Sequence, residues 1–164
     1  FGLTASFEEY CVRRSELYHS IAGDLTYQSS RSTLSYRMAK KILIVDDDSG
    51  LVEIFKAALE GAAYQVLVAP NGKRGLELAK QELPDLILLD IVMPDINGTE
   101  VLKLLKSDKQ TENLKVAIIT NFGQEETIQQ TLGLGAIEVL LKYNLGTEDI
   151  VSKVGTLLHE PASN

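Results

Sequence analysis

The chain has very few of the features that would place it in an oxidising compartment or a membrane. It contains one cysteine, Cys11, which cannot form an intramolecular disulfide and fits a reducing compartment. No apolar run approaches the roughly 20 residues that span a bilayer. The N-terminus also lacks the basic region and apolar block of a secretory signal. We therefore expect a cytoplasmic protein with no inserted segment.

Basic residues are also too few for a protein that binds a phosphate backbone. The 164 residues include 16 Lys and Arg against 23 Asp and Glu, which gives a formal net charge of −7. Because nucleic acids are bound through basic patches, we do not expect one as a direct partner. Hydrophobic residues make up 45% of the chain and charged residues 24%, as in ordinary globular proteins.

The sequence divides into three parts. Residues 1–39 are predicted to form an N-terminal extension, residues 40–160 one regular domain, and residues 161–164 a tail. Residues 1–37 hold four acidic and four basic side chains, so the negative charge lies beyond them. Nothing after the regular domain is long enough for an output domain, so we expect a protein with a single domain.

The N-terminal extension is predicted to contain one amphipathic helix. Ser6 and Glu9 have the spacing of a capping box, and apolar residues recur after them at helical spacing. The helix is expected at about residues 7–22, with a polar linker after it. Met38 resembles a translation start, so the preceding segment is a leader, a fusion remnant or a native extension.

Five apolar runs alternate with helical patterns in the regular domain. This alternation is typical of right-handed βαβ units and predicts an α/β fold, with a doubly wound parallel sheet covered on both faces. The expected strands are 42–45, 64–69, 86–89, 116–119 and 137–141.

Three helix starts are predicted from residues that can cap a helix, namely Ser49, Asn71 and Thr147. Two further helices are expected at about 99–107 and 124–134. The inward face of the first helix is predicted to be Leu51, Ile54, Phe55, Ala58 and Leu59, and that of the second Leu76, Ala79 and Leu83, ended by Pro84.

Polar side chains stand at the carboxyl ends of four of the five expected strands. Asp46 and Asp47 follow the first strand, Asp90 the third, Thr120 the fourth and Lys142 the fifth. In a parallel sheet these ends share one edge, where ligands bind. We therefore expect the five side chains to meet in one pocket. The second strand carries no comparable residue and is expected at an edge of the sheet.

Three carboxylates in one pocket repel one another, so either some are protonated or a cation lies among them. Mg²⁺ prefers carboxylate and carbonyl oxygens together with water. Asp46, Asp47 and Asp90 can supply carboxylates, and the backbone carbonyl of Val92 is a candidate fourth ligand. The donor set predicts a magnesium site.

Asp90 is predicted to be the nucleophile of this pocket. A carboxylate can attack phosphorus and form an aspartyl phosphate without a general base. Lys142 is expected to pair with one phosphoryl oxygen, and Thr120 to donate a hydrogen bond to another. Taken singly, each residue has a plainer interpretation as a cap, a turn former or a surface charge. Four strand ends of the right chemistry at one edge favour the joint interpretation.

The motifs that carry these residues resemble the receiver domain of bacterial response regulators, the CheY-like family. They are 41–48 (KILIVDDD), 89–98 (LDIVMPDING), 118–121 (IITN) and 140–142 (LLK). The spacings of 43 residues from Asp47 to Asp90, 30 to Thr120 and 22 to Lys142 are those of the family. The resemblance covers residues 40–159.

The resemblance implies a flavodoxin-like sheet in the order 2-1-3-4-5, as known for CheY. It implies a response regulator of a two-component phosphorelay, phosphorylated on Asp90 by a sensor histidine kinase or a phosphotransfer protein in a Mg²⁺-dependent reaction. The phosphorylated form would signal to a downstream protein through the face from about Gln124 to Leu158. Dimerisation on phosphorylation is a further alternative. The chain would act as a signalling phosphoacceptor rather than an enzyme.

The sequence departs from the family pattern beside Lys142. Tyr143 stands where the family usually has a proline after a cis bond, so we expect a trans or rearranged loop there. Val139 replaces a common Tyr or Phe, which makes switching through an aromatic rotamer doubtful. Phe122, two residues after Thr120, is predicted to limit water access to the phosphoryl group and to slow its hydrolysis.

Three other classes of protein are weighed against this one. A receiver-like module that binds proteins without phosphorylation would fit Tyr143 and Val139. A phosphatase with an aspartyl-phosphate intermediate would need a second Asp soon after the nucleophile, and Asp95 is the candidate. A flavin carrier of similar fold would need a loop rich in Ser and Thr after the first strand, where the chain has three Asp residues.

Overall fold

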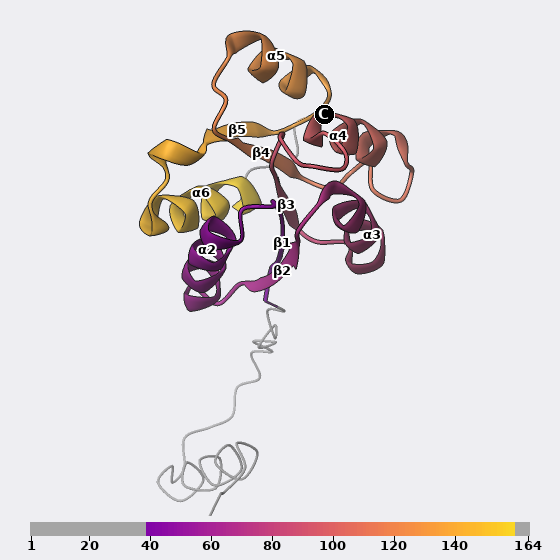
Figure 1. Cartoon of the computed structure of the whole chain (residues 1–164). Coiled ribbons are helices and arrows are strands. Elements are labelled where there is room, and N and C mark those ends of the chain that lie inside the picture. The colour runs from indigo at the N-terminus through magenta and orange to yellow at the C-terminus, as the bar shows by residue number, and fades with distance from the viewer. Residues whose placement is uncertain (1–38, 160–164) are drawn as a thin grey trace, which may run out of the picture. The chain divides into compact units, whose positions relative to one another are not determined.

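The computed structural model describes residues 39–159, in which five strands alternate with helices (Figure 1). The strands are β1 (Lys41–Val45), β2 (Gln65–Ala69), β3 (Leu86–Leu89), β4 (Val116–Thr120) and β5 (Glu138–Leu141). The helices are α2 (Ser49–Gly61), α3 (Gly72–Glu82), α4 (Gly98–Ser107), α5 (Glu125–Gly133) and α6 (Thr147–His159), with a short 3₁₀ helix, η1 (Lys142–Asn144), after β5. The helix predicted at about 7–22 and its linker lie outside the described residues.

The five strands form one parallel sheet in the order β2-β1-β3-β4-β5. This confirms the predicted doubly wound, flavodoxin-like fold and the edge position of β2. Every residue of β3 and β4 is buried, and so are four of the five residues of β1. Burial on both faces explains why these strands read as continuous apolar runs rather than as alternating patterns.

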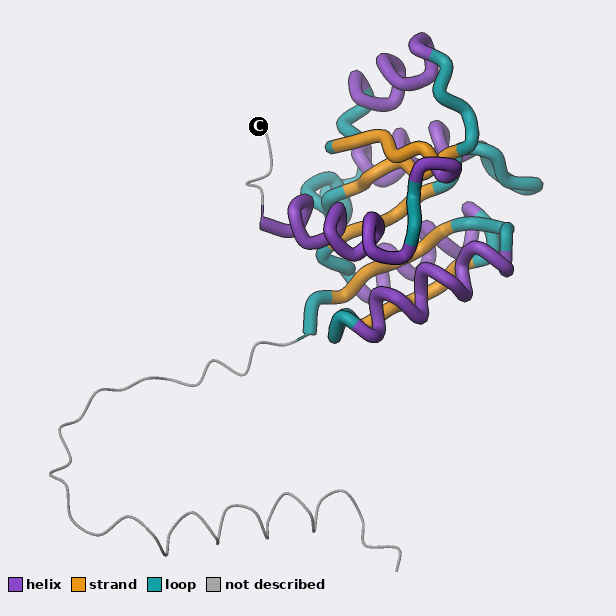
Figure 2. Tube along the Cα trace, turned by 90° about the vertical axis from the view of Figure 1, so that its left-hand side faces the viewer, coloured by secondary structure: helices purple, strands orange, loops and turns teal. Residues whose placement is uncertain are grey.

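Helices cover both faces of the sheet. Helices α2 and α6 pack on one face, and α3, α4 and α5 lie on the other (Figures 1 and 2). The core is correspondingly divided in two, with Phe55 and Val154 in one cluster and Ala79 and Val101 in the other. Within residues 39–159, no helix has the length and apolar character needed to cross a bilayer.

Two of the three predicted helix caps need correction. Asp48 caps α2, because its Oδ1 accepts hydrogen bonds from the N–H groups of Gly50 and Leu51 at 3.1 Å each, whereas Ser49 is the first helical residue. Thr147 is likewise the first residue of α6 rather than the residue before it. The cap at Asn71 is confirmed, since its side chain accepts the N–H of Arg74 at 2.9 Å.

Two residues predicted to face the core are exposed. Ile54 is 53% exposed, and Val52 is buried in its place. Leu83 is 50% exposed because α3 ends at Glu82 and Leu83 takes a left-handed conformation with φ 44°. The chain turns at Leu83 one residue before Pro84, so the end of the helix was predicted one residue too late.

Candidate functional site

The strand register brings Asp46 and Asp90 together. Val45 of β1 pairs with Leu89 of β3, so the next residue of each strand leaves the sheet at the same level. The N–H of Asp90 donates to the carbonyl of Val45 at 2.9 Å, which continues the pairing for one more residue. Strands β1 and β3 are neighbours at the point where the strand order reverses. Asp46 and Asp90 therefore both lie at the carboxyl edge of the sheet, at this switch point.

Lys142 lies between these two carboxylates. Its Nζ is 2.7 Å from Oδ2 of Asp46 and 3.1 Å from Oδ2 of Asp90. The three residues are only 3%, 5% and 8% exposed for Asp46, Asp90 and Lys142. One ammonium group thus serves two buried carboxylates, and Asp47 adds a third, exposed carboxylate beside them.

The site has an excess of negative charge. Burial raises the pKa of Asp90, and the neighbouring Asp46 adds to this, while Lys142 offsets only part of it. Burial alone would lower the pKa of Lys142, but its hydrogen bond and charge interaction with Asp46, together with Asp90, raise the pKa above its ordinary value. The raised pKa of Asp90 and the raised pKa of Lys142 both indicate a pocket that favours additional positive charge.

The three carboxylates fit a hard divalent cation. Asp46, Asp47 and Asp90 each offer an oxygen, and these oxygens all lie within 4.8 Å of one another. Oxygen donors with a net negative charge are the ligands that Mg²⁺ takes in proteins. The residues present could therefore hold such an ion, with the ammonium of Lys142 as the competing charge.

Thr120 is the last residue of β4 and is completely buried. Its Oγ1 accepts the N–H of Phe122 at 3.1 Å, which ties the hydroxyl to the loop that follows the strand. The Phe122 side chain is 48% exposed. The predicted hydroxyl donor and the predicted shield against water are thus linked through one hydrogen bond.

The loop after Lys142 has the rearranged form that its sequence predicts. No cis peptide occurs among the described residues, and η1 begins at Lys142 itself. Tyr143 is 67% exposed, whereas Lys142 stays in the pocket. The replacement of proline by tyrosine therefore does not remove the lysine from the two carboxylates. Val139 is partly buried and packs against the core cluster that includes Val101.

The hydrogen bonds of the Asp95 side chain were not predicted from the sequence. Both oxygens of Asp95 accept hydrogen bonds from the start of α3, Oδ1 from the N–H of Gly72 at 3.0 Å and Oδ2 from the N–H of Lys73 at 2.9 Å. A carboxylate committed to two backbone donors is a poor acid or base, which counts against the phosphatase alternative. Its partners lie more than 20 residues earlier in the chain, so no local sequence pattern predicts the contact.

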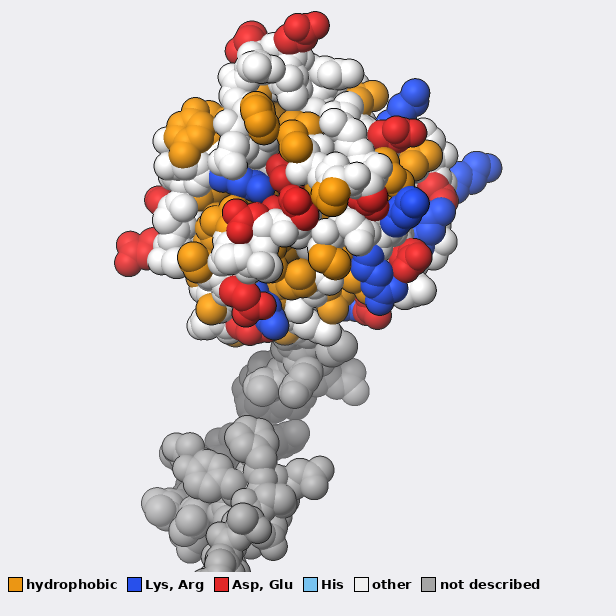
Figure 3. Space-filling model, in the orientation of Figure 1, with side chains coloured by type: hydrophobic (Ala, Val, Ile, Leu, Met, Phe, Trp, Pro, Cys, Tyr) orange, Lys and Arg blue, Asp and Glu red, His pale blue; other side chains and the backbone are white. Residues whose placement is uncertain are grey.

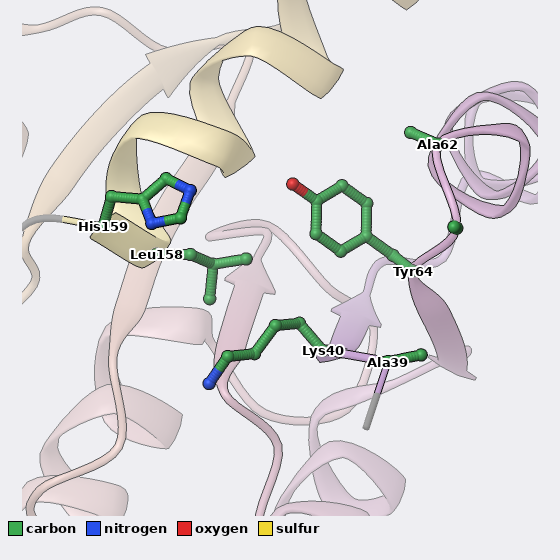
Figure 4. A pocket seen from close by; sticks show the side chains of 7 residues that line it. Ala39, Lys40, Ala62, Tyr64, Leu158 and His159 are labelled. Atoms are coloured by element: carbon green, nitrogen blue, oxygen red, sulfur yellow. The ribbon is translucent and has the colours of Figure 1, made fainter. Parts of the chain in front are cut away.

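The carboxyl edge of the sheet faces the viewer in Figure 3. Acidic side chains gather near its centre, with basic and hydrophobic side chains around them. A separate cavity of about 300 Å³ lies at the opposite edge, between the residues that precede β1 and β2 and the end of α6. Figure 4 shows the rings of Tyr64 and His159 on two of its walls. Among the described residues, the three-carboxylate group lies at the carboxyl edge and not in this cavity.

A doubly wound five-stranded sheet with clustered acids and a lysine at its carboxyl edge is the arrangement of receiver domains. The family model for the response regulator receiver domain matches residues 42–154. The chain belongs to this family and carries a receiver domain of two-component signalling.

Curated relatives agree with this assignment. The chain is similar to the polar-differentiation response regulator DivK of Brucella anthropi, with 38% identity over 96 residues that cover 57% of this chain and 78% of the relative. It is also similar to sporulation initiation phosphotransferase F of Bacillus subtilis, with 39% identity over 100 residues that cover 61% and 79%.

Solved structures show the same fold. A CheY-like receiver domain protein from Methanospirillum hungatei superposes with a TM-score of 0.67 at 32% identity, covering 73% of this chain and 94% of that one. A response regulator from Chloroflexus aurantiacus superposes with a TM-score of 0.69 at 28% identity, covering 74% and 99%.

Proposed function

We propose that this chain is a phosphoacceptor of a two-component phosphorelay and that Asp90 carries the phosphoryl group. The observation that supports this most directly is the arrangement of Asp46, Asp47 and Asp90 with ligand oxygens within 4.8 Å of one another. The ammonium of Lys142 lies between two of them. Such a pocket combines a buried carboxylate nucleophile with positive charge for the incoming phosphoryl oxygens.

The proposed reaction transfers a phosphoryl group from a histidine of the donor protein. An oxygen of Asp90 forms the new O–P bond, the N–P bond of the phosphohistidine breaks, and the donor imidazole keeps the electron pair and takes a proton. Lys142 then pairs with one phosphoryl oxygen, and the Thr120 hydroxyl donates to another. Hydrolysis by water returns Asp90 to its free form, so the chain signals rather than turning over a metabolite.

The resident cation of this proposal is Mg²⁺, held by Asp46, Asp47, Asp90 and the backbone carbonyl of Val92. When bound, it would neutralise charge on the transferring phosphoryl group. The acid-rich pocket supports the choice of a hard divalent ion, since its carboxylates exceed the single ammonium.

The proposed phosphoryl donor is a sensor histidine kinase or a phosphotransfer protein. The proposed output is a change in the packing of α5, β5 and α6 that a downstream protein, or a second copy of this chain, binds. Thr120 is the physical link, since its hydroxyl contacts the N–H of Phe122 in the loop that leads to α5. A small bias between two packed states is enough for such a switch. A cytoplasmic location and a role without enzymatic turnover stay predictions.

The test is phosphorylation of the purified chain with Mg²⁺ and acetyl phosphate, followed by intact mass. The wild type should gain one phosphoryl group that is labile to base, and Asp90→Asn should gain none. Asp85→Asn is the matched control, because Asp85 lies just before β3 whereas Asp90 lies just after it. A wild type that stays unmodified, or an Asp90→Asn variant that is still modified, would contradict the proposal.

A further inference from the structure

The segment 91–97, which connects Asp90 to α4, is fixed at both ends. The N–H of Gly98 donates to the carbonyl of Ile91 at 2.8 Å. Gly98 is also pressed against the backbone after β3, because a Cβ at this position would lie 1.9 Å from the carbonyl oxygen of Asp90. At the other end, the side chain of Asn97 accepts the N–H of Thr99 at 2.8 Å and caps α4.

Between these ends the segment is held by a different element. Asp95 accepts the first two N–H groups of α3, those of Gly72 and Lys73, at 3.0 and 2.9 Å. These donors have no partner within a helix, and a carboxylate is a favourable acceptor at a helix start. Ile96 supports the contact, since a Cβ on Gly72 would lie 3.1 Å from its carbonyl oxygen.

Helix α3 packs closely against β1. Gly75 lies so close to β1 that a Cβ there would be 2.7 Å from a methyl carbon of Val45, the residue before Asp46. Strand β1, which precedes Asp46, and the segment that follows Asp90 thus both contact α3. Among the described residues, the hydrogen bonds between this segment and the amide groups of α3 are those of the Asp95 side chain.

We propose that Asp95 is a positioning residue, whose clamp on the N-terminus of α3 holds the 91–97 segment so that the Val92 carbonyl is preorganised for the cation. This rests on the proposed function, because it assumes Val92 as a ligand. Without the clamp the segment is free to move, and part of the binding free energy goes into ordering it. Residues behind the ligands commonly change metal affinity in this way.

The experiment is calorimetric titration of the unphosphorylated full chain with Mg²⁺ alone. We expect Asp95→Ala to weaken the affinity about tenfold, the lower end of the effect of such supporting residues. Asp95→Asn should weaken it less, because an amide oxygen still accepts one of the two N–H groups. Hydrogen exchange at the amides of Gly72 and Lys73 should rise in Asp95→Ala.

The variants separate positioning from simple loss of charge. Asn and Ala remove the same negative charge, so equal affinities for the two variants would overturn the proposal, as would an affinity of Asp95→Ala within twofold of the wild type. Asp108→Ala is the matched control, because Asp108 also accepts a backbone N–H and pairs with Lys80 of α3 at 2.7 Å, but lies at the C-terminal end of α4, away from the site. If Asp95→Ala fails to fold, Asp95→Ser takes its place. The Ser hydroxyl reaches less far than the Asn amide, so Asp95→Ser must bind Mg²⁺ more weakly than Asp95→Asn, with Asp90→Asn as the reference for a damaged site, or the proposal fails.

These readouts also distinguish failure of the positioning role from failure of the proposed function. A wild type that binds Mg²⁺ but is not modified by acetyl phosphate would reject phosphorylation at Asp90 and leave the affinity series as a test of the clamp. A wild type that is phosphorylated while the Asp95 variants bind Mg²⁺ normally would reject the clamp alone.

Discussion

Phe122 is an exposed aromatic residue in the loop that follows β4, next to the site. It is 48% exposed, and its backbone rather than its ring makes the hydrogen bond to Thr120. We expect Phe122→Ala to shorten the lifetime of the phosphorylated chain several-fold, because water would reach the acyl phosphate more easily. The lifetime is measured by intact mass after removal of acetyl phosphate.

Phe122→Leu is the control for Phe122→Ala, since it keeps an apolar side chain of similar reach. It should retain most of the wild-type lifetime. If Phe122→Ala decays at the wild-type rate, the ring does not shield the phosphoryl group.

Asp85 leads to a prediction about pH. Burial raises the pKa of its carboxyl, but the hydrogen bonds from the Lys40 ammonium at 2.6 Å and from the Lys41 N–H at 2.8 Å outweigh this, so that the pKa lies below the ordinary 3.8. A carboxyl whose pKa is lowered by folding stabilises the folded state above its unfolded pKa, and this is lost as the pH falls through the folded value. Asp85→Asn should therefore lower the free energy of unfolding by about 0.5–1 kcal/mol near neutral pH, because the pair is partly exposed, and have almost no effect in acid below the folded pKa of Asp85.

Urea unfolding at both pH values tests the Asp85 prediction. Glu77→Gln is a control, since Glu77 pairs with Arg74 at 2.8 Å but its side chain is 59% exposed. Its effect should be near zero at either pH. An Asp85→Asn effect that persists unchanged in acid would show that the contribution does not depend on ionisation.

Among the secondary-structure elements, the connection between α2 and β2 contains a strained residue. Ala63 has φ 65°, in the left-handed region that favours glycine, whereas Ala62 beside it has an ordinary φ of −90°. We expect Ala63→Gly to raise the free energy of unfolding by about 0.5–1 kcal/mol, because glycine adopts this conformation without a clash. Thermal or urea unfolding measures the change.

The neighbour provides the matched control. Both alanines are exposed, so burial does not distinguish them. Ala62→Gly should destabilise the protein slightly, since it only adds freedom to the unfolded chain. Equal effects of the two substitutions would mean that the left-handed conformation at Ala63 carries no strain.

Strands and helix caps could be predicted from the sequence where a single local interaction determines them. The continuous apolar runs of β1, β3 and β4 follow from burial on both faces, and the cap at Asn71 follows from a side chain that reaches its own helix. Asp48 was missed as a cap because three acids and Ser49 compete for one helix start, and their side-chain directions are set by the fold. Ile54 was misplaced because the position of the stripe around α2 depends on packing against the sheet.

At the scale of the complete domain, the convergence of Asp46 and Asp90 was predictable, because the topology of the sheet determines it. Once β1 and β3 are parallel neighbours in register, Asp46 and Asp90 must leave the sheet together. The strand order itself came from the resemblance to the receiver family. The contact of Asp95 with Gly72 and Lys73 could not be predicted, because it joins the segment after β3 to the start of α3, and these are brought together by the tertiary fold.

The charge balance of the domain leads to the last prediction. Two buried carboxylates and one exposed carboxylate share one ammonium, so the folded chain should be less stable without a cation than with one. At Mg²⁺ a hundredfold above its dissociation constant, the free energy of unfolding should rise by about 2.7 kcal/mol, because the ion binds only the folded form. Urea unfolding with and without Mg²⁺ measures this rise.

Asp90→Asn should be more stable than the wild type in chelator, since one repelling charge is gone, and should gain much less from Mg²⁺. An equal gain in both proteins would place the ion outside this pocket, and no gain in the wild type would mean that Lys142 alone satisfies the acids.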